Sequence, residues 1–352
     1  MVISITPADR RARARADLRL GLPIAALAEG GALILAATEL LTPARLSELR
    51  RLGPVQVALT KWRAVTLSVP AHDRDLVRIR APGDAPVRWF HAMADPAFAP
   101  VRGPFDFVRA GSAAVPRAVL RLCKEAGLLP AVVSVRADPV PAGLLCLTAD
   151  DLRPPAGGGP GRVASARVPL AVSRQGRVHV YRPADGGADH YAIEVGFPAR
   201  NLPVLSRLHS ACFTGDLLGS LKCDCGAQLQ GALRQIGAEG AGVLIYLNQE
   251  GRGLGLANKM RAYALQDQGF DTAEANHRLG FEDDERDFRL GADILRDLGF
   301  SAVRLMTNNP AKVARLAEAG VRVAERVSLR AGETPDNVAY LKTKAEKFGH
   351  DL

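Results

Sequence analysis

The sequence has few aromatic residues and no long uninterrupted run of apolar residues. Aromatic side chains make up 5% of its 352 residues, so any core is expected to be aliphatic. No stretch approaches the ~20 apolar residues that cross a bilayer, and the N-terminus lacks the pattern of a signal peptide. We therefore expect a cytoplasmic protein with no membrane partner.

Disulfide bonds are not expected either. Five cysteines in a chain of this length do not suggest a disulfide framework. Cys123 and Cys146 stand alone, which is typical of core residues. Cys212, Cys223 and Cys225 lie close together in the sequence and need another explanation.

Basic residues outnumber acidic ones and give a formal net charge of +9. Such a charge suits a phosphorylated ligand or a nucleic acid. Part of the excess lies in an arginine-rich run at residues 10–15. No aromatic residues alternate with this run to stack on bases, so we interpret it as a solvated helix face and expect no nucleic-acid partner.

Residues 154–162 are dense in proline and glycine, which excludes a helix or a central strand and indicates a linker. The linker separates a domain of residues 1–153 from a domain of residues 163–352. Helix-like and strand-like patterns alternate in both parts, so the predicted fold class is α/β (α+β) with two domains. The predicted elements include strands at 32–40, 55–59, 128–135, 241–247 and 302–306, and helices at 115–126, 228–237, 256–268 and 290–298. Residues 163–182 and 190–195 are predicted to form strands of an antiparallel meander, with a turn at residues 186–187.

The three clustered cysteines indicate a metal site. Zinc takes four protein ligands in structural sites and usually three ligands plus water in catalytic sites. Cys212, Cys223 and Cys225 without an obvious fourth ligand favour a catalytic site. His209 is a possible fourth ligand of a closed structural site, and thiols without metal are a third possibility. The spacing alone leaves these alternatives open.

The residues around the cysteines resemble the zinc signature of GTP cyclohydrolase II. The signature covers residues 209–216 (His-Ser-Ala-Cys-Phe-Thr-Gly-Asp) and 220–226 (Ser-Leu-Lys-Cys-Asp-Cys-Gly). Further matches follow at residues 249–252, 261–266, 274–276, 284–288, 307–310 and 343–347, so that the resemblance runs from about residue 165 to residue 352.

The resemblance implies both a fold and a reaction. The fold is a GTP cyclohydrolase II-like mixed sheet with helices, in which Cys212, Cys223 and Cys225 bind one Zn²⁺ per subunit. The reaction is the hydrolysis of GTP, with Mg²⁺ on its phosphates, in riboflavin biosynthesis. Its products are 2,5-diamino-6-(5-phosphoribosylamino)pyrimidin-4(3H)-one, formate and diphosphate. The family also suggests a homodimer.

Three catalytic residues are implied in the same way. Tyr263 assists the hydrolysis that releases the formyl group. Arg286 is the nucleophile on the α-phosphorus, and Asp284 is its proton acceptor. Because an arginine stays protonated at neutral pH, its chemistry favours electrostatic stabilisation of phosphoryl transfer over nucleophilic attack.

A larger set of residues is implied to contact GTP. These residues are Arg207, His209, Ser210, Ala211, Gln228, Glu250, Gly251, Arg252, Thr272, Thr307 and Lys312. Gln228 and the Glu250 carboxylate can read the guanine edge, which discriminates strongly against adenine. The family usually has a glutamate at the position of Ala211, and its loss can loosen Mg²⁺ or ligand positioning or shift the substrate preference.

Two other functions stay open on the sequence. One is a cyclohydrolase-like paralogue in another pathway, such as pyrimidine catabolism. The other is a catalytically silent GTP-binding sensor. The presence of Tyr263, Asp284 and Arg286 argues against a silent sensor.

Residues 1–153 resemble a worn 3,4-dihydroxy-2-butanone 4-phosphate synthase domain. Residues 21–24 and 36–39 resemble its opening strands, and residues 109–114 and 122–128 its later helix. The acidic loop that holds Mg²⁺ in that family keeps one carboxylate, Glu29, and the later Gly-His-Thr-Glu is replaced by Gly-Ser-Ala-Ala. Without metal ligands or a base, this domain is expected to be non-catalytic and to serve structure, dimerisation or regulation.

Overall fold

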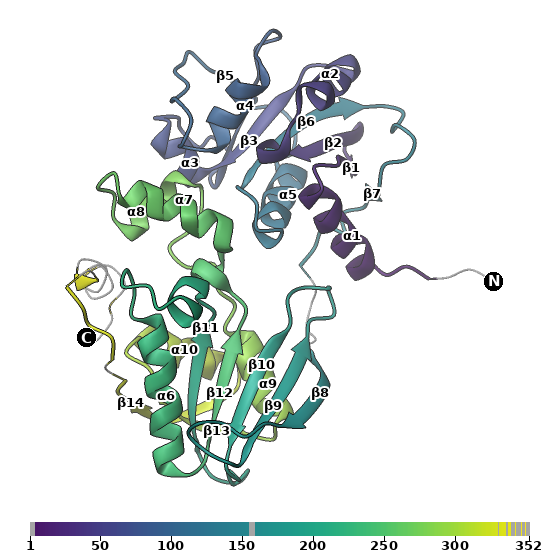
Figure 1. The fold of residues 1–352 in the computed structure, drawn as a ribbon. Coiled ribbons are helices and arrows are strands. Elements are labelled where there is room, and N and C mark those ends of the chain that lie inside the picture. Colours follow the sequence, from purple (N-terminus) through teal and green to yellow (C-terminus); the bar gives the residue numbers. More distant parts are fainter. Residues whose placement is uncertain are drawn as a thin grey trace. The chain divides into compact units, whose positions relative to one another are not determined.

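The computed structural model describes residues 4–154, 159–329, 331–335, 337, 338, 342, 346 and 349. The chain divides into two compact units, each built on its own seven-stranded sheet (Figure 1). Unit 1 comprises residues 1–156 and 254–285, and unit 2 comprises residues 157–253 and 286–352. The predicted α/β class with two domains is confirmed.

Unit 1 has a sheet with helices on both faces. Its strand order is β5-β4-β3-β6-β2-β1-β7. The strands are β1 (Ile24–Ala28), β2 (Gly31–Ala37), β3 (Gln56–Thr60), β4 (Leu76–Arg80), β5 (Asp106–Phe107), β6 (Ala131–Ala137) and β7 (Cys146–Leu147). The helices are α1 (Pro7–Arg19), η1 (Thr38–Leu40), α2 (Pro43–Leu52), α3 (Lys61–Thr66), α4 (Val87–Ala94), α5 (Ala114–Glu125), α7 (Leu256–Gln266) and α8 (Thr272–Arg278).

Side chains alternate between the two faces of this sheet, as strand geometry requires. Ala25 and Val57 face a core that contains α2, α4, α7 and α8. Ala26 and Ala58 face a second core, closed by α1 and α5. Both cores are largely aliphatic, as expected from the scarcity of aromatic residues.

Unit 2 also has helices on both faces of its sheet. The strand order is β14-β13-β11-β12-β10-β9-β8. The strands are β8 (Gly161–Arg167), β9 (Gly176–Arg182), β10 (His190–Val195), β11 (Val204–Ser210), β12 (Gly242–Leu247), β13 (Ala302–Met306) and β14 (Arg322–Val327). The helical elements are η2 (Phe213–Leu217), α6 (Cys225–Glu239), η3 (Glu250–Gly253), α9 (Arg289–Asp297) and α10 (Pro310–Glu318).

The direction of pairing divides the sheet of unit 2 into two parts. β8, β9, β10 and β12 pair antiparallel, whereas β12, β11, β13 and β14 run parallel. β12 is a continuous apolar strand, typical of a parallel strand buried on both faces. α6 packs on one face, while α9 and α10 pack on the other (Figure 1).

Some element boundaries differ from the prediction. The strand predicted at 32–40 ends at Ala37, where the 3₁₀ turn η1 begins. The linker predicted at 154–162 ends earlier, because β8 begins at Gly161 and pairs with β9. Residues 155–158 of this linker, and most of the matched tail at 343–347, lie outside the described residues.

The segment 254–285 is the main difference from the predicted division of the chain. The sequence places it in the domain of residues 163–352, but its contacts place it in unit 1. The reason is apolar packing, since Leu265 and Phe281 are buried in the same core as Val57 and Phe90. No helix in the described ranges is long and apolar enough to cross a bilayer.

Candidate active site

The predicted site residues of unit 2 gather where parallel strands end. Cys212 follows the carboxyl end of β11, Glu250 follows that of β12, and Thr307 follows that of β13. Because β11, β12 and β13 are parallel, these ends share one edge of the sheet. This edge is where open α/β sheets bind their ligands.

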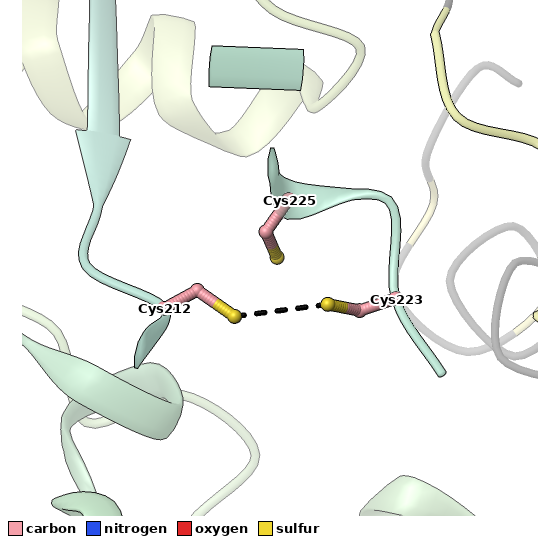
Figure 2. A group of neighbouring side chains, drawn as sticks. All are labelled: Cys212, Cys223 and Cys225. Carbon is pink, nitrogen blue, oxygen red and sulfur yellow. Dashed lines mark hydrogen bonds between the residues drawn. The ribbon is translucent and has the colours of Figure 1, made fainter. Parts of the chain in front are cut away.

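The three cysteines converge at this edge. Cys212 directly precedes η2, Cys225 is the first residue of α6, and Cys223 lies two residues before it. Their sulfurs all lie within 4.8 Å of one another, and those of Cys212 and Cys223 are 3.7 Å apart. Figure 2 shows the three side chains pointing into a common space. Hydrogen bonding to Cys212 and Cys223, followed by burial, raises the pKa of the Cys225 thiol.

Two glycines allow the cysteines to approach one another. A Cβ at Gly215 would lie 2.9 Å from the Cys223 sulfur and 3.0 Å from the Cys212 sulfur. A Cβ at Gly226 would lie 2.1 Å from the carbonyl oxygen of Gly215. Both positions are too crowded for a side chain, so glycine is required by space at each.

Asp216 organises the loop that carries Cys212. Its carboxylate accepts hydrogen bonds from the Cys212 backbone N–H at 3.0 Å and the Tyr246 hydroxyl at 2.9 Å, and it contacts His209 Nε2 at 3.0 Å. Burial lowers the pKa of His209 and raises that of Tyr246. Neither Asp216 nor Tyr246 is among the residues predicted for the site, although Asp216 is the last residue of the first signature segment, 209–216.

His209 is not part of the cysteine group. Within the described ranges, the only group of three or more residues placed to hold a metal ion is the cysteine trio. The Nε2 atom of His209 faces Asp216 instead, in the position of a residue that orients the loop. The geometry therefore favours three cysteine ligands over a closed site that includes His209.

Two cationic side chains are buried beside the cysteine loop. Arg207 on β11 donates to the carbonyl oxygen of Met306 at 2.9 Å and to Gln228 Oε1 at 2.5 Å. Burial lowers its pKa to about 10. Lys312 on α10 is also buried and donates to the carbonyl oxygen of Leu208 at 3.2 Å. Burying a cation is costly, so two such groups point to an anionic partner.

The buried polar atoms of this site are not all satisfied by protein groups. In the part of the chain that the structure describes, Nε of Arg207 and Nδ1 of His209 are buried without a hydrogen-bond partner. Buried polar atoms of this kind need an explanation in a native protein, and a polar ligand supplies one.

The turn after β12 reaches the cysteine loop. Glu250 Oε2 accepts a hydrogen bond from the Phe213 backbone N–H at 2.6 Å. Gly251 and Arg252 follow with φ of 60° and 61°. Arg252 is not a glycine, and a left-handed backbone at such a residue is strained and typical of functional sites.

The other binding residues predicted in unit 2 lie at the same edge. Ser210 Oγ accepts a hydrogen bond from Arg286 Nη1 at 3.3 Å. Ala211 is buried, and its backbone N–H donates to the carbonyl oxygen of Leu247 at 2.8 Å. Thr307 is also buried, and its hydroxyl accepts from the backbone N–H of Asn309 at 3.0 Å.

Three predicted residues belong to unit 1. Tyr263 is half-buried on α7, Thr272 is the first residue of α8, and Asp284 lies in the loop before Arg286. The division between the units falls between residues 285 and 286. Asp284 and Arg286 are therefore close in sequence but are described with different units.

The fold and the site together define a class of protein. Three cysteine sulfurs beside buried cations, at the carboxyl ends of parallel strands, are typical of a metal-binding enzyme that acts on an anionic ligand. Comparisons with known proteins identify the family within this class.

A family model described as GTP cyclohydrolase II matches residues 161–328. A GTP cyclohydrolase-2 from Azospirillum brasilense is 44% identical over 321 residues, which cover 87% of this chain and 83% of that protein. A GTP cyclohydrolase-2 from Shigella boydii serotype 18 is 60% identical over 166 residues, which cover 47% of this chain and 85% of that protein. The chain belongs to the GTP cyclohydrolase II family and is a hydrolase.

Two solved structures resemble the chain distantly. One is RibBX, a two-domain 3,4-dihydroxy-2-butanone 4-phosphate synthase from A. baumannii, with 18% identity, a TM-score of 0.34, and coverage of 90% of this chain and 99% of that chain. The other is a 3,4-dihydroxy-2-butanone 4-phosphate synthase of Candida albicans, with 18% identity, a TM-score of 0.31, and coverage of 40% of this chain and 93% of that chain.

Proposed function

We propose that this protein hydrolyses GTP to 2,5-diamino-6-(5-phosphoribosylamino)pyrimidin-4(3H)-one, formate and diphosphate, in riboflavin biosynthesis. Membership of the GTP cyclohydrolase II family supports the reaction class. The observation that carries the proposal is the convergence of three cysteine sulfurs within 4.8 Å, next to buried cations at one edge of the sheet.

The cysteine trio fits a zinc ion. Three sulfur donors suit zinc. The space around the sulfurs is too crowded for a Cβ at position 215, so it suits a single ion better than a side chain. Cys212, Cys223 and Cys225 would hold one Zn²⁺ per subunit. When bound, a zinc ion with an open position lowers the pKa of its water ligand and so supplies a nucleophile at neutral pH.

The buried cations would hold the triphosphate. Arg207 and Lys312 are fixed by hydrogen bonds to backbone carbonyl oxygens, so their charges are already in place before a ligand arrives. Arg207 Nε supplies a further donor, and Thr307 adds a hydroxyl group. We expect Mg²⁺ to accompany the phosphates as part of the substrate.

The turn after β12 and the start of α6 would recognise the base. Glu250 is a carboxylate that can accept from two N–H groups of guanine, and Gln228 can donate or accept at the same edge. Gly251 and Arg252 continue this turn, while Ser210 and Ala211 border the cysteine loop. A purine without the matching donors would leave these groups unpaired, which disfavours adenine.

Three side chains would take part in the chemistry, Tyr263, Asp284 and Arg286, and Thr272 would contact the ligand. Tyr263 would assist release of the formyl group. We assign Arg286 to stabilising negative charge on the α-phosphate and Asp284 to accepting a proton. Arg286 donates to Ser210 at 3.3 Å, which orients its guanidinium toward the residues that border the cysteine loop.

We further propose that residues 1–153 are non-catalytic and that the protein acts as a cytoplasmic homodimer. The single acidic residue left in the loop at residues 27–32 is Glu29, which is exposed at the tip of the β1–β2 hairpin. A single exposed carboxylate is a poor Mg²⁺ site. Feeding ribulose 5-phosphate and detecting a butanone phosphate product would overturn this assignment.

The activity is tested with purified protein, GTP, Mg²⁺ and one equivalent of zinc, by measuring formate and diphosphate. The variant Cys223→Ser is expected to lose zinc and nearly all turnover. Cys146→Ser is the matched control, since Cys146 is exposed in unit 1 and should keep both. No turnover by the zinc-loaded wild type would refute the proposed reaction, and full activity of Cys223→Ser would refute the role of the metal.

A further inference from the structure

The N-terminal half buries the apolar side of the segment 254–285. Ala262, Leu265, Leu279 and Phe281 from this segment are at most 5% exposed. They belong to the same core as residues of β3, β4, α2 and α4. The segment that carries Tyr263 and Asp284 is thus part of the fold of unit 1, and it cannot detach without exposing this core to water.

Close to Tyr263, the helix α7 is tied to two carboxylates of the N-terminal half. Arg261 donates from Nη2 to Glu39 Oε1 at 2.9 Å and from Nε to Asp95 Oδ2 at 3.0 Å. Glu39 also accepts from the Leu129 backbone N–H at 2.7 Å, so this carboxylate is itself held in place. Two such hydrogen bonds from one side chain restrict the rotation of α7 about its axis.

A second anchor on α7 lies one turn earlier. Asn258 is fully buried and donates to the carbonyl oxygen of Gly127 at 3.1 Å. Its side-chain oxygen accepts from Arg261 at 2.8 Å, which joins the two anchors into one network. Such networks of buried polar groups specify a single arrangement when their members are satisfied.

Close to Asp284, side chains of the N-terminal half hold both flanking glutamates. Trp62 donates from Nε1 to Glu282 Oε2 at 2.6 Å. Lys124 donates to Glu285 Oε1 at 2.5 Å, and both side chains of this pair are less than 20% exposed. Asp284 lies between these two fixed points.

The same tryptophan also contacts α8. Its ring stacks on that of His277 with centroids 3.6 Å apart and planes 2° from parallel. Thr60, two residues before Trp62, donates from its hydroxyl to the carbonyl oxygen of Gly280 at 2.7 Å. The loop that leads to Asp284 is therefore held along its length by β3 and α3.

We infer that the N-terminal half is a positioning domain for the reaction of the C-terminal half. Trp62 and Lys124 act as positioning residues, because they fix the loop on either side of Asp284 without being reacting groups. Glu39 and Asp95 position Tyr263 indirectly, because they hold Arg261, which lies two residues before Tyr263 on α7. This inference rests on the proposed function, and it gives a role to a half of the chain that has no chemistry of its own.

The test compares conservative variants of the full-length, zinc-loaded protein. Trp62→Phe keeps an aromatic ring for His277 but removes the donor to Glu282. Lys124→Met removes the charge opposite Glu285, and Lys124→Arg restores it. The control is Trp89→Phe, because Trp89 packs against the same core and contacts the ring of Phe90.

We expect Trp62→Phe and Lys124→Met to lower kcat for GTP about tenfold or more, since a displacement of ~1 Å at a reacting group has effects of this size. Zinc content should stay at the wild-type level and KM within about threefold, because the proposed phosphate contacts belong to unit 2. Lys124→Arg and Trp89→Phe should keep near wild-type kcat. If Trp62→Phe unfolds, the Lys124→Met and Lys124→Arg pair decides the question.

The possible failures are distinguishable. An inactive wild type with full zinc content would refute the proposed function, and this inference with it. An active wild type with unchanged kcat in both Trp62→Phe and Lys124→Met would refute the positioning role alone. An equal loss in Trp89→Phe would show a general loss of stability and would also overturn the positioning role.

Discussion

Replacing Gly215 by alanine places a methyl group among the three cysteines. The added carbon would lie 2.9 Å from the Cys223 sulfur, 3.0 Å from the Cys212 sulfur and 3.0 Å from the Cβ of Cys225. Ordinary contacts between such atoms are about 3.5 to 4.0 Å, so each neighbour must retreat by about 0.5 Å or more. The backbone at Gly215 has no left-handed φ, so the effect is one of space alone.

The size of the effect follows from the tolerance of a metal site. Metal–ligand distances hold within about 0.2 Å, which is less than the displacement that the methyl group imposes on two sulfurs. Overpacking of this kind costs about 1 to 3 kcal/mol. At about 1.4 kcal/mol per factor of ten, the expected loss in zinc affinity is about tenfold to a hundredfold.

The assay is a competition titration of zinc against a chromogenic chelator, with thermal unfolding measured on the same samples. Gly161→Ala is the control, since a Cβ at Gly161 meets no atom within 4 Å and its backbone is not left-handed. A folded Gly215→Ala variant that binds zinc as tightly as the wild type would show that the sulfurs do not converge as described.

Two further predictions concern side chains of unit 2. Asp216→Asn removes the charge from the acceptor that orients the cysteine loop, and we expect about tenfold to a hundredfold weaker zinc binding. Asp189→Asn, which removes one side of an exposed ion pair with Arg182, should have little effect. Equal zinc affinities in the two variants would contradict the role of Asp216. Burial lowers the pKa of His190, whose Nδ1 accepts a hydrogen bond from the Asn248 backbone N–H at 3.0 Å. The stabilisation from this neutral histidine is therefore complete at a pH above the ordinary histidine pKa near ~6.5, and it is lost as the pH falls from there toward the lowered pKa of the folded state. Urea unfolding between pH 7.5 and 5 should therefore show a decline that is smaller in His190→Gln, and identical slopes would disprove the assignment.

The sequence predicted the elements whose signals are local. The strand predicted at 241–247 is the continuous apolar run of β12 (Gly242–Leu247), and the helix predicted at 228–237 lies within α6 (Cys225–Glu239). The cysteine spacing likewise indicated a metal site, because few other reasons bring three thiols together. Such features depend on neighbours within a few residues, and a single sequence contains that information.

The features that escaped prediction depend on contacts distant in the sequence. The apolar residues of 254–285 indicated that one side of α7 is buried. Because the hydrophobic effect is not directional, they did not indicate which part of the chain packs against that side. Its partner lies about two hundred residues earlier, at Thr60 and Trp62. The role of Asp216 was equally unpredictable, since its carboxylate accepts a hydrogen bond from Tyr246, which lies near the carboxyl end of β12, 30 residues later.

The membership of 254–285 in unit 1 limits how this protein can be divided. The chain leaves unit 2 after residue 253 and returns to it at residue 286, so the junction near residue 157 is only one of three covalent connections. A fragment that begins at Gly161 would carry α7 and α8 without their core, with Leu265 and Phe281 open to water and to aggregation. We therefore expect this chain to fold as one piece, and a variant that exchanges the N-terminal half to stay soluble only if the apolar surface of 254–285 is replaced at the same time.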